Sequence, residues 1–486
     1  MSRSVDVLIV GMGPTGATLA ALLGDLGVKT LVIEKDTEVY PLPRAAHFDH
    51  EIMRLFQQLG VAEAVARHAR PAPAYEFRAA DGQLLMRFDS TASATPSGWR
   101  ASYMFHQPGV ELALRDRLAT LPSVEARTGW KLAGFKADGD GVEAALEGPQ
   151  GVETVHARWL VGCDGASSAV RAGVGGELFD YGFDEPWLVV DVKVGEGART
   201  PEVNLQICDP ARPTTCVLMG PGRHRWEFML LPGEDPAAVV SDDFIRPLIE
   251  AWDVGDIELE RRAVYRFHGL VAKTWRSGRV LLAGDAAHQM PPFAGQGMCS
   301  GLRDAANLAW KLAAVLGGAD DALLDTYQTE REPHVRGYVE LAIQMGRTVC
   351  TLDRAEAAAR DAAMLAATRP PVPMFTPSLG AGCLRADDPA AGALFIQTWS
   401  EGRGLDDELG SGPWLIARTE PPAAAGVVSV GLDRLAPAHR EGLSAWLDRH
   451  GASAVLVRPD RYVFGAGDPG RLLQDWRARV AAPALA

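Results

Sequence analysis

Residues 5–16 read VDVLIVGMGPTG, in which an apolar run leads directly into a G-x-G-x-x-G turn. The apolar run predicts a buried strand, and leucines at helical spacing after the turn predict a helix that ends at Gly27. A second predicted strand, residues 30–33, is followed by Glu34. Strand, glycine turn, helix, strand and acidic residue in this order are typical of a dinucleotide-binding fold.

The three glycines of the turn have separate roles in such a fold. Gly11 allows the tight turn, Gly13 lets the backbone approach a pyrophosphate, and Gly16 lets the helix pack closely on the strand. The N-terminus of the helix offers unpaired N–H groups and a partial positive charge to the phosphates. Glu34 can accept hydrogen bonds from ribose hydroxyls and would repel a 2′-phosphate. On these residues alone, the nucleotide is either FAD or NAD.

The composition is that of a globular protein with more than one domain. With 486 residues, 47% of them hydrophobic, the chain is long enough for two or three domains. Its net charge of −14 and the lack of a basic tract argue against nucleic acid or an anionic membrane as a partner. No apolar run has transmembrane length, and the first predicted strand begins too early to leave room for a signal peptide. The six scattered cysteines form no C-x-x-C or Cys/His cluster, which favours a cytoplasmic protein without a metal.

Two further glycine-bearing turns follow predicted strands. Residues 159–162 lead into Asp164, where the backbone can approach phosphate or ribose, although such a turn is common by itself. Residues 279–283 lead into Gly284 and Asp285, and a long predicted helix begins shortly afterwards. The start of that helix is a potential site for an anion or a carbonyl group, and Asp285 can bind a hydroxyl of a polyol.

The remaining patterns indicate two more units. Four apolar or alternating runs between residues 186 and 267 indicate an antiparallel sheet inserted between the halves of the nucleotide domain. A proline-rich break at residues 369–377 marks a boundary, after which a small α/β unit is expected. Arg44, just past the second strand, either reaches back to the pyrophosphate or is an ordinary solvated arginine.

The three glycine-bearing turns, in this order, resemble those of the flavoprotein aromatic hydroxylases, the single-component FAD monooxygenases with the para-hydroxybenzoate hydroxylase fold. The resemblance covers about residues 3–345, and residues 295–308 look most like the 3-(3-hydroxyphenyl)propionate hydroxylase branch. The tail is similar to the thioredoxin-like C-terminal domain of phenol hydroxylase and the polyketide hydroxylases, but it lacks the redox cysteines. Without redox chemistry, this tail can still form contacts between the subunits of a homodimer.

The resemblance implies an α/β protein with a Rossmann-like FAD-binding domain of the glutathione reductase type. An antiparallel-sheet substrate domain is inserted into it, and a thioredoxin-like α/β domain follows. We expect residues 1–185 and 268–375 to form the FAD-binding domain, with a small hairpin at 75–100. Residues 186–267 are then the substrate domain, and 376–486 the C-terminal domain.

The family pattern also implies which residues contact the cofactor. The positions that match it are Gly11, Gly13, Pro14, Thr15, Gly16, Glu34, Lys35, Arg44, Gln107, Asp164, Gly284, Asp285, Pro292, Gly295, Gly297 and Met298. Asp164 lies in a motif that the family uses for both FAD and the transient nicotinamide cofactor. Many relatives have Asn where this chain has Cys299, so any role of that Asn side chain is lost.

The chemistry implied is the hydroxylation of a phenolic ring. NADH or NADPH reduces FAD, O2 adds to the flavin as a C4a-hydroperoxide, and one oxygen atom passes to a small aromatic substrate. The expected substrate is a phenol similar to 3-(3-hydroxyphenyl)propionate, in aromatic degradation. Two alternatives remain, a tailoring hydroxylase of aromatic polyketides and an FAD oxidoreductase that inserts no oxygen.

Several residues are candidates for the substrate side of the site. His47, three residues past Arg44, either accepts the phenol proton or is a packed histidine bonded to the backbone. The candidates for the substrate lining are Trp226, Phe228, Tyr265 and Pro292. Their aromatic members fit an ordinary hydrophobic core equally well.

Overall fold

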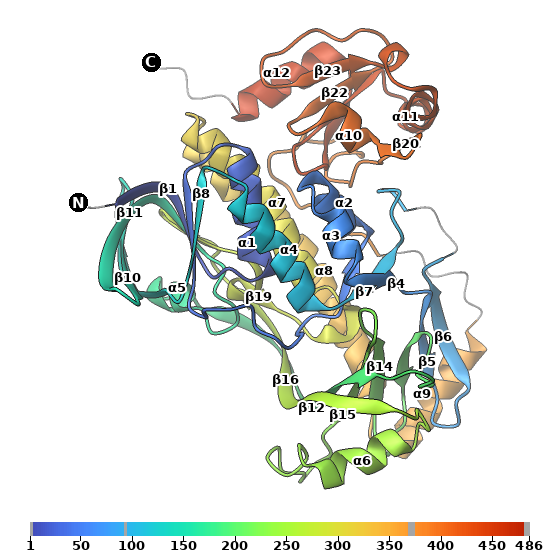
Figure 1. Cartoon of the computed structure of the whole chain (residues 1–486). Coiled ribbons are helices and arrows are strands. Elements are labelled where there is room, and N and C mark those ends of the chain that lie inside the picture. Colours follow the sequence, from blue (N-terminus) through green and yellow to red (C-terminus); the bar gives the residue numbers. More distant parts are fainter. Residues whose placement is uncertain (1–2, 92–94, 368–374, 481–486) are drawn as a thin grey trace.

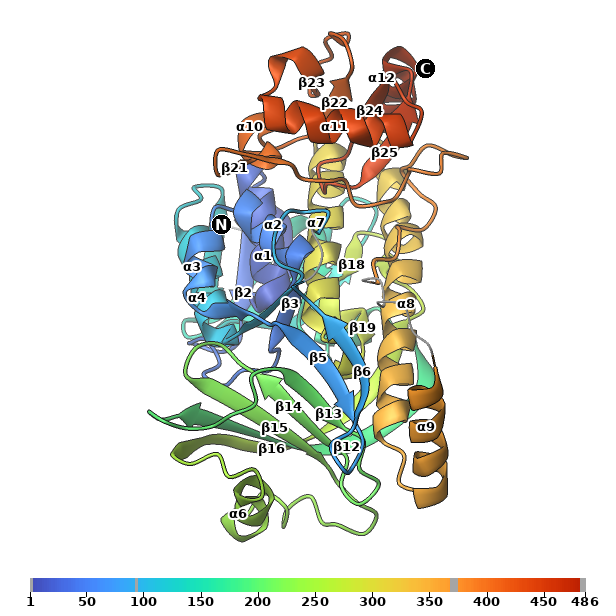
Figure 2. The ribbon, with the colours of Figure 1, turned by 90° about the vertical axis from the view of Figure 1, so that its right-hand side faces the viewer.

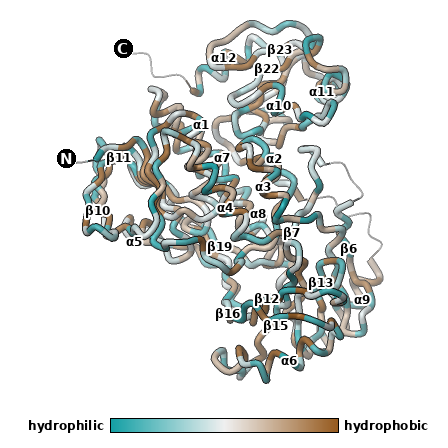
Figure 3. The backbone as a smooth tube through the Cα atoms, in the orientation of Figure 1, coloured by the Kyte–Doolittle hydropathy of each residue, from teal (hydrophilic) through white to brown (hydrophobic). Residues whose placement is uncertain are grey.

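The computed structural model describes residues 3–91, 95–367 and 375–480 (Figure 1). Three sheet-based units are visible: one that contains the N-terminal strand lies in the middle, a second lies below it, and the third, built from the C-terminal part of the chain, lies above. In none of the described ranges is a helix long and apolar enough to cross a membrane. Hydrophobic and hydrophilic residues are interspersed along all three units (Figure 3).

The first sheet contains five neighbouring parallel strands, in the order β18-β11-β1-β2-β8. Their bounds are Val280–Leu282 (β18), Gly151–Gly162 (β11), Arg3–Val10 (β1), Thr30–Glu34 (β2) and Val124–Thr128 (β8). Three antiparallel strands extend it, β17 (Arg276–Ser277), β10 (Val142–Gly148) and β9 (Lys131–Ala137). The central strands are almost wholly buried, as expected for a parallel sheet covered on both faces.

Three helices pack together beside this sheet (Figure 1). They are α1 (Pro14–Asp25), α4 (Gln107–Ala119) and α7 (Gly297–Leu316). The predicted order of strand, turn, helix and strand at the N-terminus is confirmed, because β1, α1 and β2 follow one another and β1 pairs with β2. A Rossmann-like domain is thereby established for this part of the chain.

The second sheet has the order β19-β16-β12-β15-β14-β13-β5-β6. Its strands are Ala74–Arg78 (β5), Leu84–Asp89 (β6), Leu178–Val194 (β12), Asn204–Ile207 (β13), Thr214–Leu218 (β14), Arg223–Met229 (β15), Ile257–Ala272 (β16) and His288–Gln289 (β19). All neighbours are antiparallel except β5 and β13, which run parallel. The hairpin of β5 and β6, which the sequence grouped with the FAD-binding domain, joins this sheet through β13. The sheet thus draws on residues outside 186–267.

Strand alternation gives the second sheet two different faces. One face packs on α6 (Asp242–Glu250), which lies on the side away from the first sheet (Figures 1 and 2). Trp226 and Phe228 of β15 belong to that core, together with Ile245 and Ile249 of α6. The alternate residues of β15 therefore point toward the first sheet.

Further helices and short strands connect these sheets. The helices are α2 (His50–Gln58), α3 (Ala62–Ala66), α5 (Ala169–Gly173), α8 (Asp325–Val349) and α9 (Arg354–Ala366). A three-stranded sheet, β3-β7-β4, contains His47–Asp49 (β3), Ala69–Pro71 (β4) and Ser102–Phe105 (β7). The predicted proline-rich boundary at 369–377 falls largely on residues 368–374, which lie outside the described residues.

The C-terminal unit has a four-stranded sheet in the order β23-β22-β24-β25, with only β22 and β23 parallel. Its elements are Trp414–Ala417 (β22), Val428–Gly431 (β23), Pro437–Arg449 (α11), Ala454–Val457 (β24), Val463–Gly467 (β25) and Pro469–Val480 (α12). This order is that of a thioredoxin-like sheet, as the resemblance implied. The connection from β22 to β23 contains no helix. Residues 376–486 contain a single cysteine, Cys383, so no cysteine pair can form within this domain.

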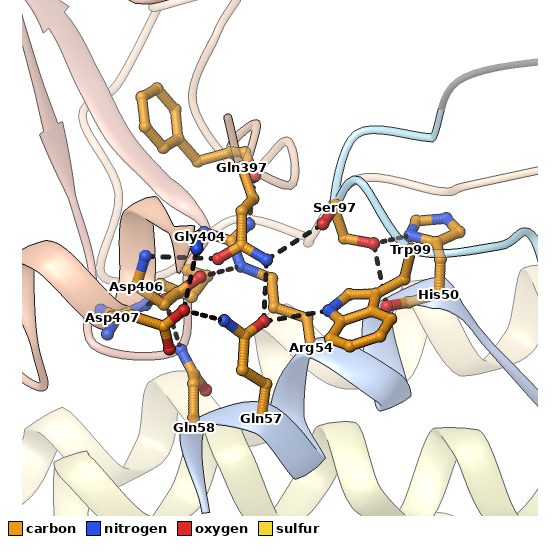
Figure 4. Close-up of polar contacts among 12 residues, drawn as sticks. His50, Arg54, Gln57, Gln58, Ser97, Trp99, Gln397, Gly404, Asp406 and Asp407 are labelled. Atoms are coloured by element: carbon orange, nitrogen blue, oxygen red, sulfur yellow. Dashed lines mark hydrogen bonds and ion pairs between the residues drawn. The ribbon is translucent and has the colours of Figure 1, made fainter. Parts of the chain in front are cut away.

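The C-terminal unit is attached to the rest through buried polar groups (Figure 4). Asp406, in the short helix α10 (Leu405–Leu409), accepts hydrogen bonds from Arg54 Nε at 2.6 Å and from Gln58 Nε2 at 3.0 Å. It also pairs with Arg461. Arg54 and Gln58 belong to α2, so this cluster joins the thioredoxin-like unit to the helix that follows β3.

Candidate functional site

The three glycine-bearing turns meet at one edge of the first sheet. Val10 at the end of β1 pairs with Gly162 of β11, and Gly162 pairs with Leu282 of β18. Because these strands are parallel, the turns that follow them emerge side by side. Brought together by this register, the turns form the carboxyl edge where α/β proteins bind ligands.

Glycine is required where the first two turns touch. Gly11 has φ +96°, and a Cβ atom there would overlap the carbonyl oxygen of Cys163. A Cβ atom on Gly16 would overlap the carbonyl oxygen of Gly11. These two glycines therefore allow the first turn, the second turn and α1 to pack in contact.

Thr15 connects the first turn to the third. A Cβ atom on Gly284, which has φ +63°, would lie 2.7 Å from Thr15 Oγ1. A Cβ atom on Gly301 of α7 would overlap the same hydroxyl oxygen. The backbone of α7 and the third turn can thus approach α1 only because both positions are glycine.

Gly13 differs from the other glycines of the first turn, because a Cβ atom there would meet nothing within 4 Å. It forms the N-cap of α1 without any side-chain cap, and the first helical hydrogen bond runs from Ala17 N to Gly13 O. The N–H groups of Thr15 and Gly16 are consequently left for a ligand. This is the arrangement that a pyrophosphate requires.

The N-terminus of α7 is a second group of backbone donors. Gln296 is its N-cap and provides no side-chain cap, and the first helical bond runs from Ser300 N to Gln296 O. Gly297 and Met298 therefore carry N–H groups that the helix does not use. Such donors suit the carbonyl edge of a flavin ring. Pro292, in the preceding 3-10 turn Pro292–Ala294, is exposed.

Two acidic residues lie at the same edge of the sheet. Glu34 ends β2, and its Oε2 accepts a hydrogen bond from Met12 N at 2.9 Å. Asp285 is accessible in its turn, yet desolvation raises its pKa, while the charges of His288 and Arg44 act in the opposite direction. Both carboxyl groups can accept hydrogen bonds from ligand hydroxyls. For Asp285, such a bond would offset the free-energy cost of desolvating the carboxylate.

Gln107 and Asp164 have visible roles within the protein. Gln107 Oε1 accepts hydrogen bonds from Arg44 N at 2.9 Å and Ala45 N at 2.6 Å, so this amide holds the Arg44 segment in place. Asp164 accepts from Ser168 Oγ at 2.5 Å and from Val170 N at 3.1 Å, which fixes the second turn.

Two basic candidates are placed more loosely. The guanidinium of Arg44 lies 5.0 Å from the ring centre of Tyr40. Its positive charge acts to lower the pKa of Asp285 in the third turn. Lys35 is exposed just beyond β2. A contact of either side chain with the cofactor stays a prediction.

His47 lies beside the turn before α7. Its Nδ1 is 3.0 Å from Gly295 O, and a Cβ atom on Gly295 would lie 2.8 Å from Nδ1. Because a carbonyl oxygen only accepts, we assign the hydrogen to Nδ1, which leaves Nε2 with a free lone pair. Burial lowers the pKa of His47, so the neutral imidazole is favoured near pH 7. Cys299 is buried next to it, with Sγ 3.8 Å from His47 O and from Gly295 O.

The sequence reasoning missed an ion network behind His47. Arg303 of α7 pairs with Asp49 and, at 2.6 Å, with Glu51. Its Nη1 also donates to Gln296 Oε1 at 2.9 Å, and Tyr462 of the C-terminal unit donates to Glu51 at 2.7 Å. Arg303 lies in the run 295–308 quoted for the resemblance, but a partner more than two hundred residues away cannot be read from sequence.

The structure corrects the predicted substrate lining for two residues. Trp226 and Phe228 are buried in the core under α6, on the face of the second sheet that points away from the glycine turns. Tyr265 is on the other face, where it pairs in register with Trp187, and the guanidinium of Arg261 lies 4.8 Å from its ring centre. Of the three aromatic candidates, only Tyr265 stays a prediction for the substrate side.

A chain of neutral polar groups occupies that face instead. Tyr75 Oη donates to Phe293 O at 3.0 Å and accepts from Gln206 Nε2. Thr215 Oγ1 donates to Gln206 Oε1 at 2.8 Å. Phe293 belongs to the turn that leads into α7, so this chain ends beside the backbone donors of that helix. Alternating polar residues in the strands were the sequence signal for it.

The site as a whole fits FAD. Gly13 leaves open space beside unused N–H groups, which suits the pyrophosphate, and the two acidic residues suit ribose and ribityl hydroxyls. Residues 4–342 match the family model described as the FAD binding domain, and residues 437–482 match the HcaD C-terminal domain. The chain belongs to the family of FAD-dependent aromatic hydroxylases.

Named relatives narrow the description. The chain is 41% identical to the probable NADH-specific resorcinol 4-hydroxylase of Rhodococcus jostii (strain RHA1), over 99% of this chain and 96% of the relative. It is 34% identical to the 3-(3-hydroxy-phenyl)propionate/3-hydroxycinnamic acid hydroxylase of Burkholderia cenocepacia (strain HI2424), over 95% and 94%. A crystal structure of aklavinone-11 hydroxylase with FAD and aklavinone aligns with a TM-score of 0.81 at 26% identity, over 99% of both chains. The predicted FAD-dependent monooxygenase of phenolic rings, with a nicotinamide cofactor and O2 as co-substrates, is thereby confirmed.

Proposed function

We propose that this enzyme hydroxylates a single-ring phenol with NADH as the reductant. The observation that carries the proposal is the 41% identity, along nearly the whole chain, to a relative named for NADH and resorcinol. The other relative is also named for single-ring phenols, whereas the aklavinone enzyme is only 26% identical. A polyketide substrate is therefore the weaker candidate. The homodimer and the cytoplasmic location stay predictions from the sequence.

The chain's own residues bind FAD and the substrate, orient them, and accept the proton of the phenol. FAD, when bound, supplies the transfer of one oxygen atom from O2 to the ring. A phenolate reacts faster than a phenol, so a proton acceptor near the substrate hydroxyl speeds this transfer. We assign that role to Nε2 of His47, because Gly295 O holds the hydrogen on Nδ1 and burial keeps the ring neutral.

The substitution His47→Asn tests this role. We expect kcat at pH 7 to fall about a hundredfold, in the usual range for losing a general base. In the wild type, kcat should fall only when the pH drops below the lowered pKa of His47, since a protonated ring accepts no proton. In the variant that acid limb should disappear, and kcat should rise at alkaline pH as the free phenol ionises. His268→Asn, at a half-buried position of β16, is the control and should keep the wild-type profile. An unchanged profile in His47→Asn would remove His47 from the mechanism.

The proposed reaction is tested by supplying NADH, O2 and a panel of phenols to the FAD-loaded enzyme. Resorcinol should raise NADH consumption, and the product should be one oxygen atom heavier. If NADH oxidation in the presence of every phenol produces only hydrogen peroxide and no oxygenated product, the enzyme is an oxidoreductase that inserts no oxygen.

A further inference from the structure

One deeply buried carboxyl group, that of Glu227, lies on the inner face of the second sheet. Glu227 of β15 is 4% exposed and pairs in register with Thr215 of β14 and Val189 of β12. Among the described residues no hydrogen bond reaches its carboxyl oxygens, and the nearest cation is Arg225 Nη1 at 3.7 Å. A carboxyl group this deeply buried is costly unless water or a ligand donates a hydrogen bond to it.

The two arginines beside Glu227 already bind other groups of the protein. Arg225 donates to Asp191 at 2.6 Å, to Pro43 O at 2.7 Å and to Arg44 O at 3.0 Å. Arg261 also bonds Pro43 O and lies 3.5 Å from Asp191. Both arginines therefore hold the Arg44 segment against the sheet and offer little to a negatively charged ligand.

The row that contains Glu227 leads to the cofactor side. Gln206 and Thr215 pair in register, and Thr215 pairs with Glu227 on the next strand, so the three side chains share one face. Tyr75, which the hydrogen-bond chain links to Gln206, reaches the turn before α7 through Phe293 O. Glu227 thus lies at the end of a neutral polar row that begins at the flavin corner.

The charge state of Glu227 discriminates between ligands. Burial raises its pKa to about 7, with Arg225 acting in the opposite direction. A ligand hydroxyl can bond to either the acid or the carboxylate. A ligand carboxylate brings a second negative charge next to it, and like charges in a buried site repel strongly.

We propose that Glu227 binds a second hydroxyl group of the substrate, and that the enzyme selects neutral dihydroxybenzenes over phenols with a carboxylate side chain. This inference rests on the proposed function and names the substrate class for the same site. It makes Glu227 a specificity-determining residue, and it sets this chain apart from the relative named for 3-(3-hydroxy-phenyl)propionate.

The test compares ligands that differ by one group. Binding of resorcinol, phenol and 3-(3-hydroxyphenyl)propionate to the FAD-loaded enzyme is measured from the change in flavin absorption. The wild type should bind resorcinol at least about tenfold tighter than the propionate. Glu227→Leu should weaken resorcinol about tenfold, as expected for losing one buried hydrogen bond, and leave phenol unchanged.

A second variant separates charge from hydrogen bonding. Glu227→Gln should strengthen binding of the propionate several-fold, because the negative charge is gone. Glu185→Gln is the matched control, because Glu185 is a half-buried acid on β12 four residues from Val189. It should leave the affinities for resorcinol, phenol and the propionate unchanged.

Two outcomes would overturn the inference. One is equal weakening of resorcinol and phenol by Glu227→Leu, or no weakening of either. The other is a wild type that prefers the propionate. If instead no phenol yields an oxygenated product in the wild type, the proposed function itself is wrong, and product analysis shows this independently of the binding data.

Discussion

Gly13→Val is expected to give a folded protein that does not bind FAD. A Cβ atom at Gly13 meets nothing within 4 Å, and its φ of −70° and ψ of −174° are open to any residue, so the fold tolerates a side chain. The same side chain would occupy the space where the backbone must approach the pyrophosphate. We expect FAD affinity to fall at least about a hundredfold, which corresponds to about 3 kcal/mol.

Visible absorption reports bound FAD, and circular dichroism reports the fold. Gly134→Val is the matched control, because a Cβ atom on Gly134 of β9 would likewise meet nothing within 4 Å, while this residue lies far along the chain from the turns. It should remain yellow. Gly16→Val should fail differently, by misfolding, because its Cβ would overlap Gly11 O. A Gly13→Val protein as yellow as the wild type would place the pyrophosphate elsewhere.

Asp406→Ala is expected to lower the free energy of unfolding by about 3–5 kcal/mol, the usual cost of leaving buried charges without their partner. Asp406 neutralises Arg54 and Arg461, and all three side chains are almost completely buried. Figure 4 shows Asp406 and Arg54 where α2 meets the C-terminal unit. Removal of Asp406 leaves two buried guanidinium groups without the carboxylate that pairs with both. The C-terminal unit should then detach or unfold first.

Urea unfolding followed by tryptophan fluorescence measures this loss. Asp407→Ala is the control, because its exposed carboxylate bonds Gln57 and Gly404 N and should contribute only about 1 kcal/mol. Equal losses in the two variants would show that the buried cluster does not hold the unit in place.

The same cluster predicts a pH dependence. Burial alone would raise the pKa of Asp406, but Arg54 and Arg461 lower it below the ordinary 3.8. A lowered pKa in the folded state means that the stabilisation is complete above pH 3.8 and is lost as the pH falls further. The stability difference between wild type and Asp406→Ala should therefore shrink only in acid below that value.

The sequence was sufficient for the cofactor corner because each part of it is local. The turn at Gly11 to Gly16, the strand before it and the helix after it are consecutive, and glycine at these positions has a direct steric reason. The register of parallel strands then brings Asp164 and Asp285 to the same edge without any further information.

The substrate side could not be predicted in the same way. Alternation along β15 separates Trp226 and Phe228 from Arg225 and Glu227, but it does not say which face meets the cofactor. The face is decided by α6, because its apolar side packs against the two aromatic residues. Likewise, the pairing of β5 with β13 is a long-range contact for which the local sequence carries no signal.

The most direct test of the account is to follow the oxygen atom. The FAD-loaded enzyme is given NADH, resorcinol and O2 enriched in the heavy isotope, and the aromatic product is examined by mass spectrometry. We predict that one labelled oxygen atom enters the ring for each NADH consumed. Product without the label, or NADH oxidation that ends entirely in labelled hydrogen peroxide, would contradict the claim that this flavin site hydroxylates a phenol.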